Sequence, residues 1–408
     1  MPDIATATPQ MMRRVNAATV LGAIRSSNAV TVSELMDVTG LTRATTISVC
    51  EDLMARGWIR ELEKDSDTYQ KGRPARRFEL DESAGCVLGI DVGVLKTTVV
   101  VADLRGRTVG RASEPFRGRE IEAEERIRVI SETALLALDA AGVAPDKVLA
   151  VTVGLAAPVG RDGNILVSQP FWSLFDVGLK KALHDLHGWA VVLENDANLA
   201  ALGERWRGSA VGVDDLVVLL SGERFGSGVM ESGRLLHGAA GGAGEMAYLD
   251  MVEGVGSPDG LAALARLWAA EALAGTSKTT LRTAAAPGHE VTAEHVFAAA
   301  AQGDKVALGI LDRLSDRLAR VVSTVAILLN PELVVIGGAV ADSASTLLET
   351  TARKLANYTA TPPRLAASPL GDAIVGIGAV RHALDHVEKN SLDLELRRVQ
   401  LPASKDTR

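Results

Sequence analysis

Apolar residues in the first eighty positions recur at helical spacing. Every third residue from 15 to 24 is apolar, which predicts a helix over residues 11–27. A second, short helix is expected to begin with Ser33 as its N-cap and to run to about Val38. The apolar positions of the first helix are Val15, Ala18, Leu21 and Ile24.

A third helix is expected directly after a glycine turn. Gly40 supplies the tight turn, Thr42 can cap the helix, and Gly57 ends it before a strand that begins at Trp58. Two helices joined by such a turn and followed by a strand indicate a winged helix-turn-helix domain. The positions of the third helix that should face inward are Thr46, Val49, Cys50 and Leu53.

The third helix and the segment after it carry candidate DNA contacts. Arg43, Thr45 and Ser48 stand at the N-terminal end of the helix, the end that would enter the major groove. Farther on, Arg73 and Arg76 flank a turn and could contact the DNA backbone or the minor groove as a wing. The alternative is a small protein-binding domain with a solvated basic loop.

The pattern changes to apolar strands after residue 85. Residues 86–107 read as strand, glycine turn, strand and hairpin, and residues 215–238 repeat that order, which indicates an internal duplication. A helical pattern follows each unit, over about 122–141 and 261–273. Strands followed by helices predict an α/β fold, and two such lobes suggest an actin-like sugar-kinase architecture.

Composition narrows the class of protein. The chain has 408 residues, 47% of them hydrophobic and 23% charged, which suits several globular domains. It has two cysteines, no apolar run long enough for a membrane helix, and no signal-peptide core at its start, so we expect a cytoplasmic protein without a membrane partner. The net charge is −8, yet residues 1–80 hold 11 Lys and Arg against 10 Asp and Glu. Only this head is therefore suited to approach nucleic acid.

The order and spacing of several motifs resemble those of the ROK family (repressor, open reading frame, kinase), in its repressor branch. The motifs are Gly40-Leu41, Gly72-Arg73-Pro74, Asp91-x-Gly93-x-x-Lys96, Glu194-Asn195-Asp196-Ala197-Asn198, Ala200-Ala201-Leu202-Gly203-Glu204, His237-Gly238, Ala243-Gly244-Glu245, and Asn330-Pro331-Glu332 before Ile336-Gly337-Gly338. The family's kinases lack the eighty-residue head, so the head favours a regulator.

The resemblance implies a sugar site between two lobes. Asp196 matches the family's catalytic base, and Asn195 and Glu245 are further candidate ligand contacts. Asn195 and Asp196 could instead cap the following helix. Trp172 is another candidate, because sugars often stack on aromatic rings, although it could simply anchor its loop.

Three departures from the family pattern argue against a kinase and against zinc. Val94 and Leu95 replace a glycine and a threonine of the first phosphate loop, and Glu223 places an anion in the second, where Arg224 could neutralise it. Tyr248 stands where the family has a zinc-binding histidine that also contacts sugar, and no cysteine follows it. We therefore expect no kinase activity, no cofactor and no metal, and we keep Tyr248 as a ligand candidate.

The expected organisation has three parts. Residues 1–80 form the winged head, residues 81–194 with 372–408 form the first α/β lobe, and residues 195–371 form the second lobe, which holds ligand contacts and an oligomer interface. The expected function is a DNA-binding regulator, a repressor that responds to a sugar or sugar phosphate as a homodimer or homotetramer on operator DNA. The alternatives are a sugar kinase with an added head, and a regulator that has lost small-molecule binding.

Overall fold

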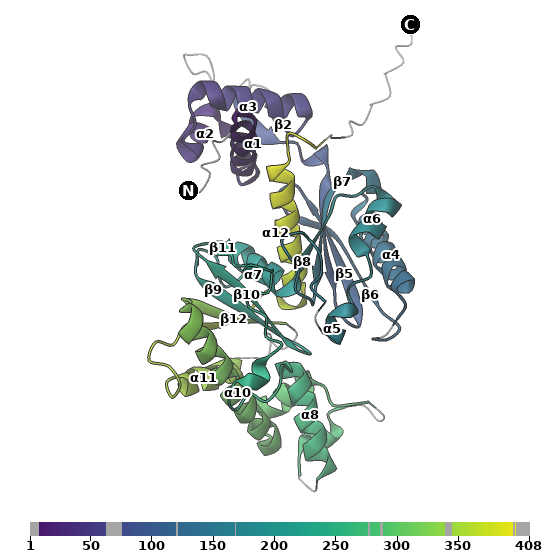
Figure 1. Ribbon diagram of the computed structural model, residues 1–408, viewed down its shortest axis with the longest axis vertical. Coiled ribbons are helices and arrows are strands. Elements are labelled where there is room, and N and C mark those ends of the chain that lie inside the picture. Colours follow the sequence, from purple (N-terminus) through teal and green to yellow (C-terminus); the bar gives the residue numbers. More distant parts are fainter. Residues whose placement is uncertain are drawn as a thin grey trace.

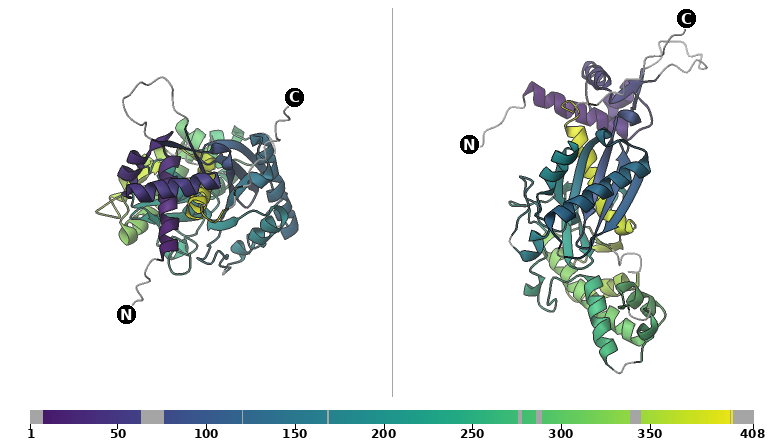
Figure 2. Two further views of the ribbon diagram at one scale, coloured as in Figure 1. Left: turned by 90° about the horizontal axis from the view of Figure 1, so that it is seen from above. Right: turned by 90° about the vertical axis from the view of Figure 1, so that its right-hand side faces the viewer.

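The computed structural model describes residues 8–62, 76–119, 121–167, 169–275, 278–285, 289–338, 345–394 and 396. Figure 1 shows a small head above two lobes, and the right-hand view of Figure 2 shows the same elongated arrangement from the side. No helix in the described part of the chain is long and apolar enough to cross a membrane.

The head contains the expected helix-turn-helix. Its helices are α1 (Pro9–Arg25), α2 (Val32–Thr39) and α3 (Arg43–Arg56). Its antiparallel sheet has the order β1 (Val30–Thr31), β3 (Arg77–Leu80) and β2 (Ile59–Glu61). The four inward positions expected for α3 are all buried, and Gly40 and Gly57 end α2 and α3 in left-handed conformation.

The sequence pattern placed the N-cap of α2 two residues too late. Ser33 was expected to cap α2, but the N-cap is Thr31, whose hydroxyl accepts from the Glu34 backbone N–H at 3.2 Å. The Glu34 carboxylate in turn accepts from the Thr31 backbone N–H at 2.7 Å. This reciprocal pair satisfies two N–H groups at once, whereas Ser33 could have satisfied one.

Each lobe is built on a five-stranded mixed sheet with the same topology. The first has the order β6 (Thr108–Pro115), β5 (Lys96–Asp103), β4 (Cys86–Val92), β7 (Val148–Leu155) and β8 (Val191–Asn195). The second has the order β11 (Arg234–Leu235), β10 (Phe225–Glu231), β9 (Leu216–Ser221), β12 (Leu333–Gly337) and β13 (Arg364–Ala367). In both, three antiparallel strands precede two parallel strands, which confirms the predicted duplication.

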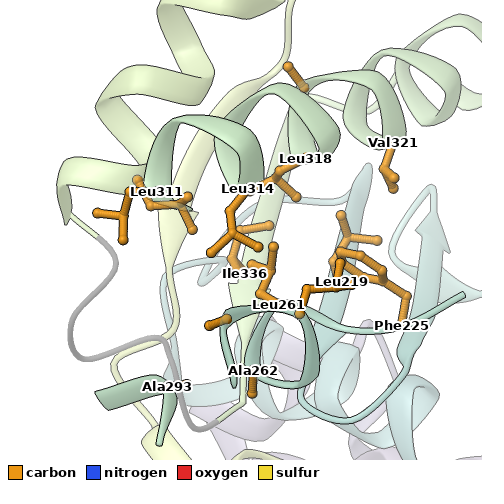
Figure 3. Packing of buried hydrophobic residues seen from close by; sticks show 14 of the residues in the cluster. Leu219, Phe225, Leu261, Ala262, Ala293, Leu311, Leu314, Leu318, Val321 and Ile336 are labelled. Carbon is orange, nitrogen blue, oxygen red and sulfur yellow. The ribbon is translucent and has the colours of Figure 1, made fainter. Parts of the chain in front are cut away.

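Helices complete the two lobes. The first carries α4 (Ala123–Ala141), α5 (Pro170–Ser173) and α6 (Leu179–His187), and the second carries α8 (Leu261–Ala274), α9 (Ala293–Ala301), α10 (Lys305–Leu329) and α11 (Ser345–Leu355). Short 3₁₀ turns lie at Glu82–Ala84, Pro145–Lys147, Leu249–Met251, Thr280–Thr283 and Gly371–Ala373. Figure 3 shows the core of the second lobe, where Leu314 and Leu318 of α10 pack towards Ile336 and Leu261.

Two helices pack against each other between the sheets. They are α7 (Asp196–Arg207) and α12 (Ile374–Lys389), which approach so closely that a Cβ atom on Gly378 would lie 1.7 Å from the Leu199 carbonyl oxygen. A Cβ on Gly89 of β4 would lie 2.5 Å from the Gly376 carbonyl oxygen, and one on Gly228 of β10 would lie 2.0 Å from that of Ala197. Glycine at these points lets the helix pair touch both sheets.

The head rests on the C-terminal end of α12 (Figure 1). The Trp58 indole N–H donates to the Ser391 carbonyl oxygen at 2.7 Å, and Arg25 forms an ion pair with Glu388 in which both side chains are largely buried. Arg14 pairs with Asp393 at 2.9 Å on the surface. The head is thus joined to α12 by both buried and exposed contacts.

Candidate ligand site and DNA-binding helix

The N-terminal end of α3 presents some of its expected DNA contacts to solvent. Arg43 and Ser48 are exposed. Thr45 is half-buried, and its hydroxyl lies 2.9 Å from the hydroxyl of Thr42, the helix N-cap. Arg43 and Ser48 are therefore the freer of the three groups to reach DNA.

Of the two expected wing arginines, the structure describes Arg76 but not Arg73. Arg73, with the rest of the Gly72–Pro74 turn, lies outside the described residues. Arg76 is engaged by Glu61 at 2.9 Å and Glu51 at 3.4 Å, and its guanidinium lies over the Phe78 ring. Arg76 would have to leave two carboxylates before it could contact a phosphate.

The strand-to-helix junction at residues 194–198 positions Asp196. β8 ends at Asn195, whose side-chain oxygen accepts from the backbone N–H groups of Ala197 at 3.0 Å and Asn198 at 3.1 Å. The Asn195 amide nitrogen donates to the Ala157 carbonyl oxygen at 3.2 Å. Asn195 is thus the N-cap, and its side chain is already committed to holding the junction together. Asp196 begins α7 and also accepts from the Ala197 N–H, at 2.8 Å.

Two further carboxyl groups from other elements lie near enough to Asp196 of α7 to act on its charge: Asp91 of β4 and Glu245 of the loop after β11. We call these three groups the carboxyl cluster. Burial and the nearby Asp91 carboxylate raise the pKa of Asp196 to about 8. Burial raises the pKa of Asp91 to about 6, and desolvation also raises that of Glu245. Near neutral pH the cluster therefore holds both protonated and ionised carboxyls, which can donate to and accept from hydroxyl groups.

Glu194, two residues before Asp196, makes a second polar contact at this junction. His237 Nε2 is 2.9 Å from Glu194 Oε2, and the Asn198 amide donates to the other oxygen at 2.9 Å. Burial opposes ionisation of Glu194, but these hydrogen bonds hold its pKa below the usual range, and the bond to Glu194 raises the pKa of His237. Both residues occur in the sequence motifs, but nothing in the sequence showed that they pair across the two lobes.

The two aromatic candidates from the sequence, Trp172 and Tyr248, lie in different environments. Trp172 is 6% exposed and belongs to the core of the first lobe, so its ring anchors the loop and offers no free face to a sugar. Its neighbour Phe171 is only partly buried and has the guanidinium of Arg224 4.9 Å above its ring. Tyr248 is 58% exposed, next to a buried Ala247.

Comparisons with known proteins bear on the whole chain. The family model described as "ROK family" matches residues 87–385, and that of the IclR helix-turn-helix domain matches residues 15–63. The chain belongs to the ROK family. With its helix-turn-helix head, it has the domain composition of the family's transcriptional regulators.

Individual ROK relatives are distant. A xylose repressor from Caldicellulosiruptor bescii is 22% identical over 80% of this chain and 84% of that protein. A glucokinase from Thermotoga maritima is 31% identical over 67% of this chain and 87% of that protein. A crystal structure of a ROK family transcriptional regulator, a homologue of the E. coli MLC protein, has a TM-score of 0.77 at 20% identity and covers 93% of this chain and 98% of its own, which shows the shared fold.

In the second phosphate loop of the ROK pattern, Glu223 forms ion pairs with residues other than the expected Arg224. Glu223 pairs with Arg119 at 3.1 Å and with Arg266 of α8 at 2.6 Å. Arg224, the expected neutralising residue, instead lies over Phe171. In the first loop, Val94 packs against the core and Leu95 is 50% exposed. Within the described residues, no group of three His, Cys, Asp or Glu side chains is arranged to hold a metal ion.

Proposed function

We propose that this ROK protein is a DNA-binding transcriptional repressor whose operator affinity falls when a sugar or sugar phosphate binds between its lobes. The helix-turn-helix head, with Arg43 and Ser48 exposed at the start of α3, supports the DNA-binding half of the proposal. The carboxyl cluster at the junction of the two lobes supports the ligand-binding half, because sugar hydroxyls need both hydrogen-bond donors and acceptors.

The observation that carries the proposal is the physical link between the two sites. Asp196 starts α7, and α7 packs against α12 with no side chain between Gly378 and Leu199. The far end of α12 carries Glu388, which pairs with Arg25 of the head. A ligand that moves one lobe relative to the other would therefore tilt α12 and the head with it. Such a shift alters operator affinity if the two states bind DNA differently.

Two heads would be needed to read a near-palindromic operator, so we propose that the active form is a homodimer or homotetramer. The xylose repressor relatives make xylose the first effector to test. If no sugar or sugar phosphate stabilises the protein while operator binding persists, the alternative of a regulator without a small-molecule ligand gains support.

DNA binding is tested by two arginines at opposite ends of one helix. Arg43→Ala removes a cation from the expected groove end of α3, and Arg56→Ala removes one from the other end; both side chains are exposed. Arg43→Ala should weaken operator binding in a gel-shift or anisotropy titration and flatten its salt dependence, because one DNA contact is lost. Arg56→Ala should bind as wild type does. Equal affinities and salt slopes for all three proteins would refute the assignment of α3.

A sugar kinase is the second candidate, favoured by the match to a glucokinase and by the retained Asp196. We consider it weaker, because an anionic Glu223 and a β-branched Val94 stand where the family places phosphate-binding backbone. Sustained, Asp196-dependent release of ADP with glucose or xylose would favour the kinase.

A further inference from the structure

A buried arginine of α10 holds the short segment that leads into α8. Arg317 is 3% exposed, and its Nε donates to the Val255 carbonyl oxygen at 2.8 Å. Another nitrogen of the same guanidinium donates to the Ser257 carbonyl oxygen. Burial lowers the pKa of Arg317 to about 10, so the guanidinium is still charged near neutral pH, and the nearby Asp259 carboxylate favours the charged form. We call residues 255–259 the clamped segment.

The clamped segment is in direct contact with the turn between β9 and β10. The Phe225 N–H donates to the Pro258 carbonyl oxygen at 2.9 Å. One residue farther on, a Cβ atom on Gly260 would lie only 2.2 Å from the Gly222 carbonyl oxygen. The Arg317 guanidinium also lies over the Phe225 ring, 5.2 Å from its centre. Arg317 therefore holds the first residue of β10 both directly and through the clamped segment.

The start of β10 in turn contacts the site at Asp196 and beside Glu245. A Cβ atom on Gly226 would lie 3.9 Å from Asp196 Oδ1, so the strand lies close to this carboxyl group. The hydroxyl of the next residue, Ser227, donates to the Gly244 carbonyl oxygen at 2.6 Å. The position of β10 thus determines how Asp196 is covered and where the residue before Glu245 is held.

We propose that Arg317 is a positioning residue for the ligand site. Through the clamped segment it fixes the start of β10, and so controls how much water reaches Asp196 and where Glu245 lies. This inference rests on the proposed function for the role of the site, but the contacts of Arg317 do not depend on which ligand binds. The stretch after Tyr248 lacks the cysteines of the ROK pattern, and a guanidinium holds its carbonyl oxygens.

The pH dependence of stability tests this role without any ligand. Burial, with the charges of Asp91 and Glu245, raises the pKa of Asp196 to about 8. A raised pKa favours the folded protein only below that value, so Asp196→Asn should gain stability relative to its parent as the pH rises from about 4 to about 8. Urea titrations of both proteins, with and without Arg317→Gln, measure where this gain ends.

In the Arg317→Gln background the gain should end at a lower pH. A loosened β10 would admit water to Asp196 and return its pKa towards the ordinary value. Loss of a positive charge by itself would raise this pKa, so the sign separates loosening from a direct electrostatic effect. A gain that ends at the same pH, with stability lowered equally at every pH, would show that Arg317 only supports the fold and would overturn the inference.

Two further variants keep the result interpretable. Arg320→Gln is the matched control: Arg320 stands one turn later on α10 and donates to the Glu253 carbonyl oxygen at 3.2 Å, outside the clamped segment. It should leave the pH profile of Asp196 unchanged, and a shift as large as that of Arg317→Gln would overturn the assignment to Arg317. Arg317→Lys keeps the charge and a donor, so it should restore part of the profile and carries the test if Arg317→Gln does not fold.

Calorimetry with xylose separates this inference from the proposed function. If xylose binds the wild type, Arg317→Gln should weaken its binding roughly tenfold, as loss of one well-placed hydrogen bond to a charged group would, and Arg320→Gln should bind it as wild type does. Equal xylose affinity in the wild type and Arg317→Gln would count against the positioning role. If xylose does not bind the wild type, the proposed effector is wrong, while a shifted pH profile still supports the role of Arg317.

Discussion

At the scale of single residues, the neighbouring side chains of Asn195 and Asp196 have different roles at the β8–α7 junction. Asn195 caps α7 and holds Ala157, while Asp196 lies near Asp91 and Glu245. The sequence could not assign these tasks, because either residue type can cap a helix or contact a sugar. The geometry separates them, and two variants can test the separation.

Asn195→Ala should lower the free energy of unfolding by about 1 kcal/mol through loss of the cap. Asp196→Ala should leave operator binding intact but weaken the effector about ten- to a hundredfold, since it removes a charged or proton-donating partner of a hydroxyl. Chemical denaturation and calorimetry on the same preparations measure both effects. An Asp196→Ala protein with unchanged effector affinity would exclude Asp196 from the site.

The pKa of Asp196 also predicts how stability depends on pH. Burial and the Asp91 carboxylate raise this pKa from 3.8 to about 8, so between these values the folded protein binds more protons at this site than the unfolded chain. The contribution of Asp196 to stability is therefore fully present below about pH 4 and is lost as the pH rises to about 8. Asp196→Asn cannot ionise and keeps an acceptor for the Ala197 N–H.

The difference in unfolding free energy, Asp196→Asn minus wild type, should therefore increase as the pH rises from about 4 to about 8. Above about pH 8 this difference should be constant. Urea titrations at intervals across this range measure the difference. A difference that is constant with pH would show that Asp196 titrates at an ordinary value in the folded protein.

At the scale of elements, the α7–α12 pair depends on glycine. A Cβ on Gly378 would lie 1.7 Å from a backbone carbonyl oxygen, which no side-chain adjustment can relieve, so Gly378→Ala must push the two helices apart. Gly309, in the exposed part of α10, has no atom within 4 Å of such a Cβ.

Gly378→Ala should destabilise the protein by about 1–3 kcal/mol or more, whereas Gly309→Ala should stabilise it by about 0.5–1 kcal/mol through helix propensity. Melting temperatures of both variants, made in the same way, measure the contrast. A neutral Gly378→Ala would mean that α7 and α12 are not in close contact in solution.

Local sequence signals predicted most elements, because caps, turns and apolar spacing act within a few residues. The ends of α3 at Thr42 and Gly57, and the repeated strand order of the lobes, follow from such signals. The pairs Glu194–His237 and Glu223–Arg119 could not be predicted, since they join segments that only the tertiary fold brings together. Trp172 shows the same limit: a ring beside an expected site can as easily fill the core.

At the scale of the whole molecule, the proposed function requires that the head and the inter-lobe site communicate. The Arg25–Glu388 pair is a largely buried ion pair between the head and α12, with side chains 11% and 13% exposed. A nearby pair, Arg14–Asp393, joins the same parts at the surface, with both side chains 46% exposed. These two pairs offer a comparison of a buried link with an exposed one.

Removing Glu388 alone would leave the Arg25 charge without its carboxylate, whereas removing Arg25 alone would leave Glu388 with Arg381 at 3.6 Å, so both members of the pair should be replaced together. In Arg25→Gln/Glu388→Gln, two neutral amides of similar size can still meet. We expect this double variant to bind operator and effector separately, but with a smaller effect of one ligand on the affinity for the other. In wild type that effect should correspond to a coupling free energy of about 1–3 kcal/mol, equal in both directions.

The matched control is the exposed pair. Arg14→Gln/Asp393→Asn should keep the wild-type coupling, because an exposed ion pair contributes little. Operator titrations with and without effector measure the coupling, and effector titrations with and without operator check that it is reciprocal. Full coupling in the variant lacking the buried pair would mean that the signal does not pass through the contact between α12 and the head.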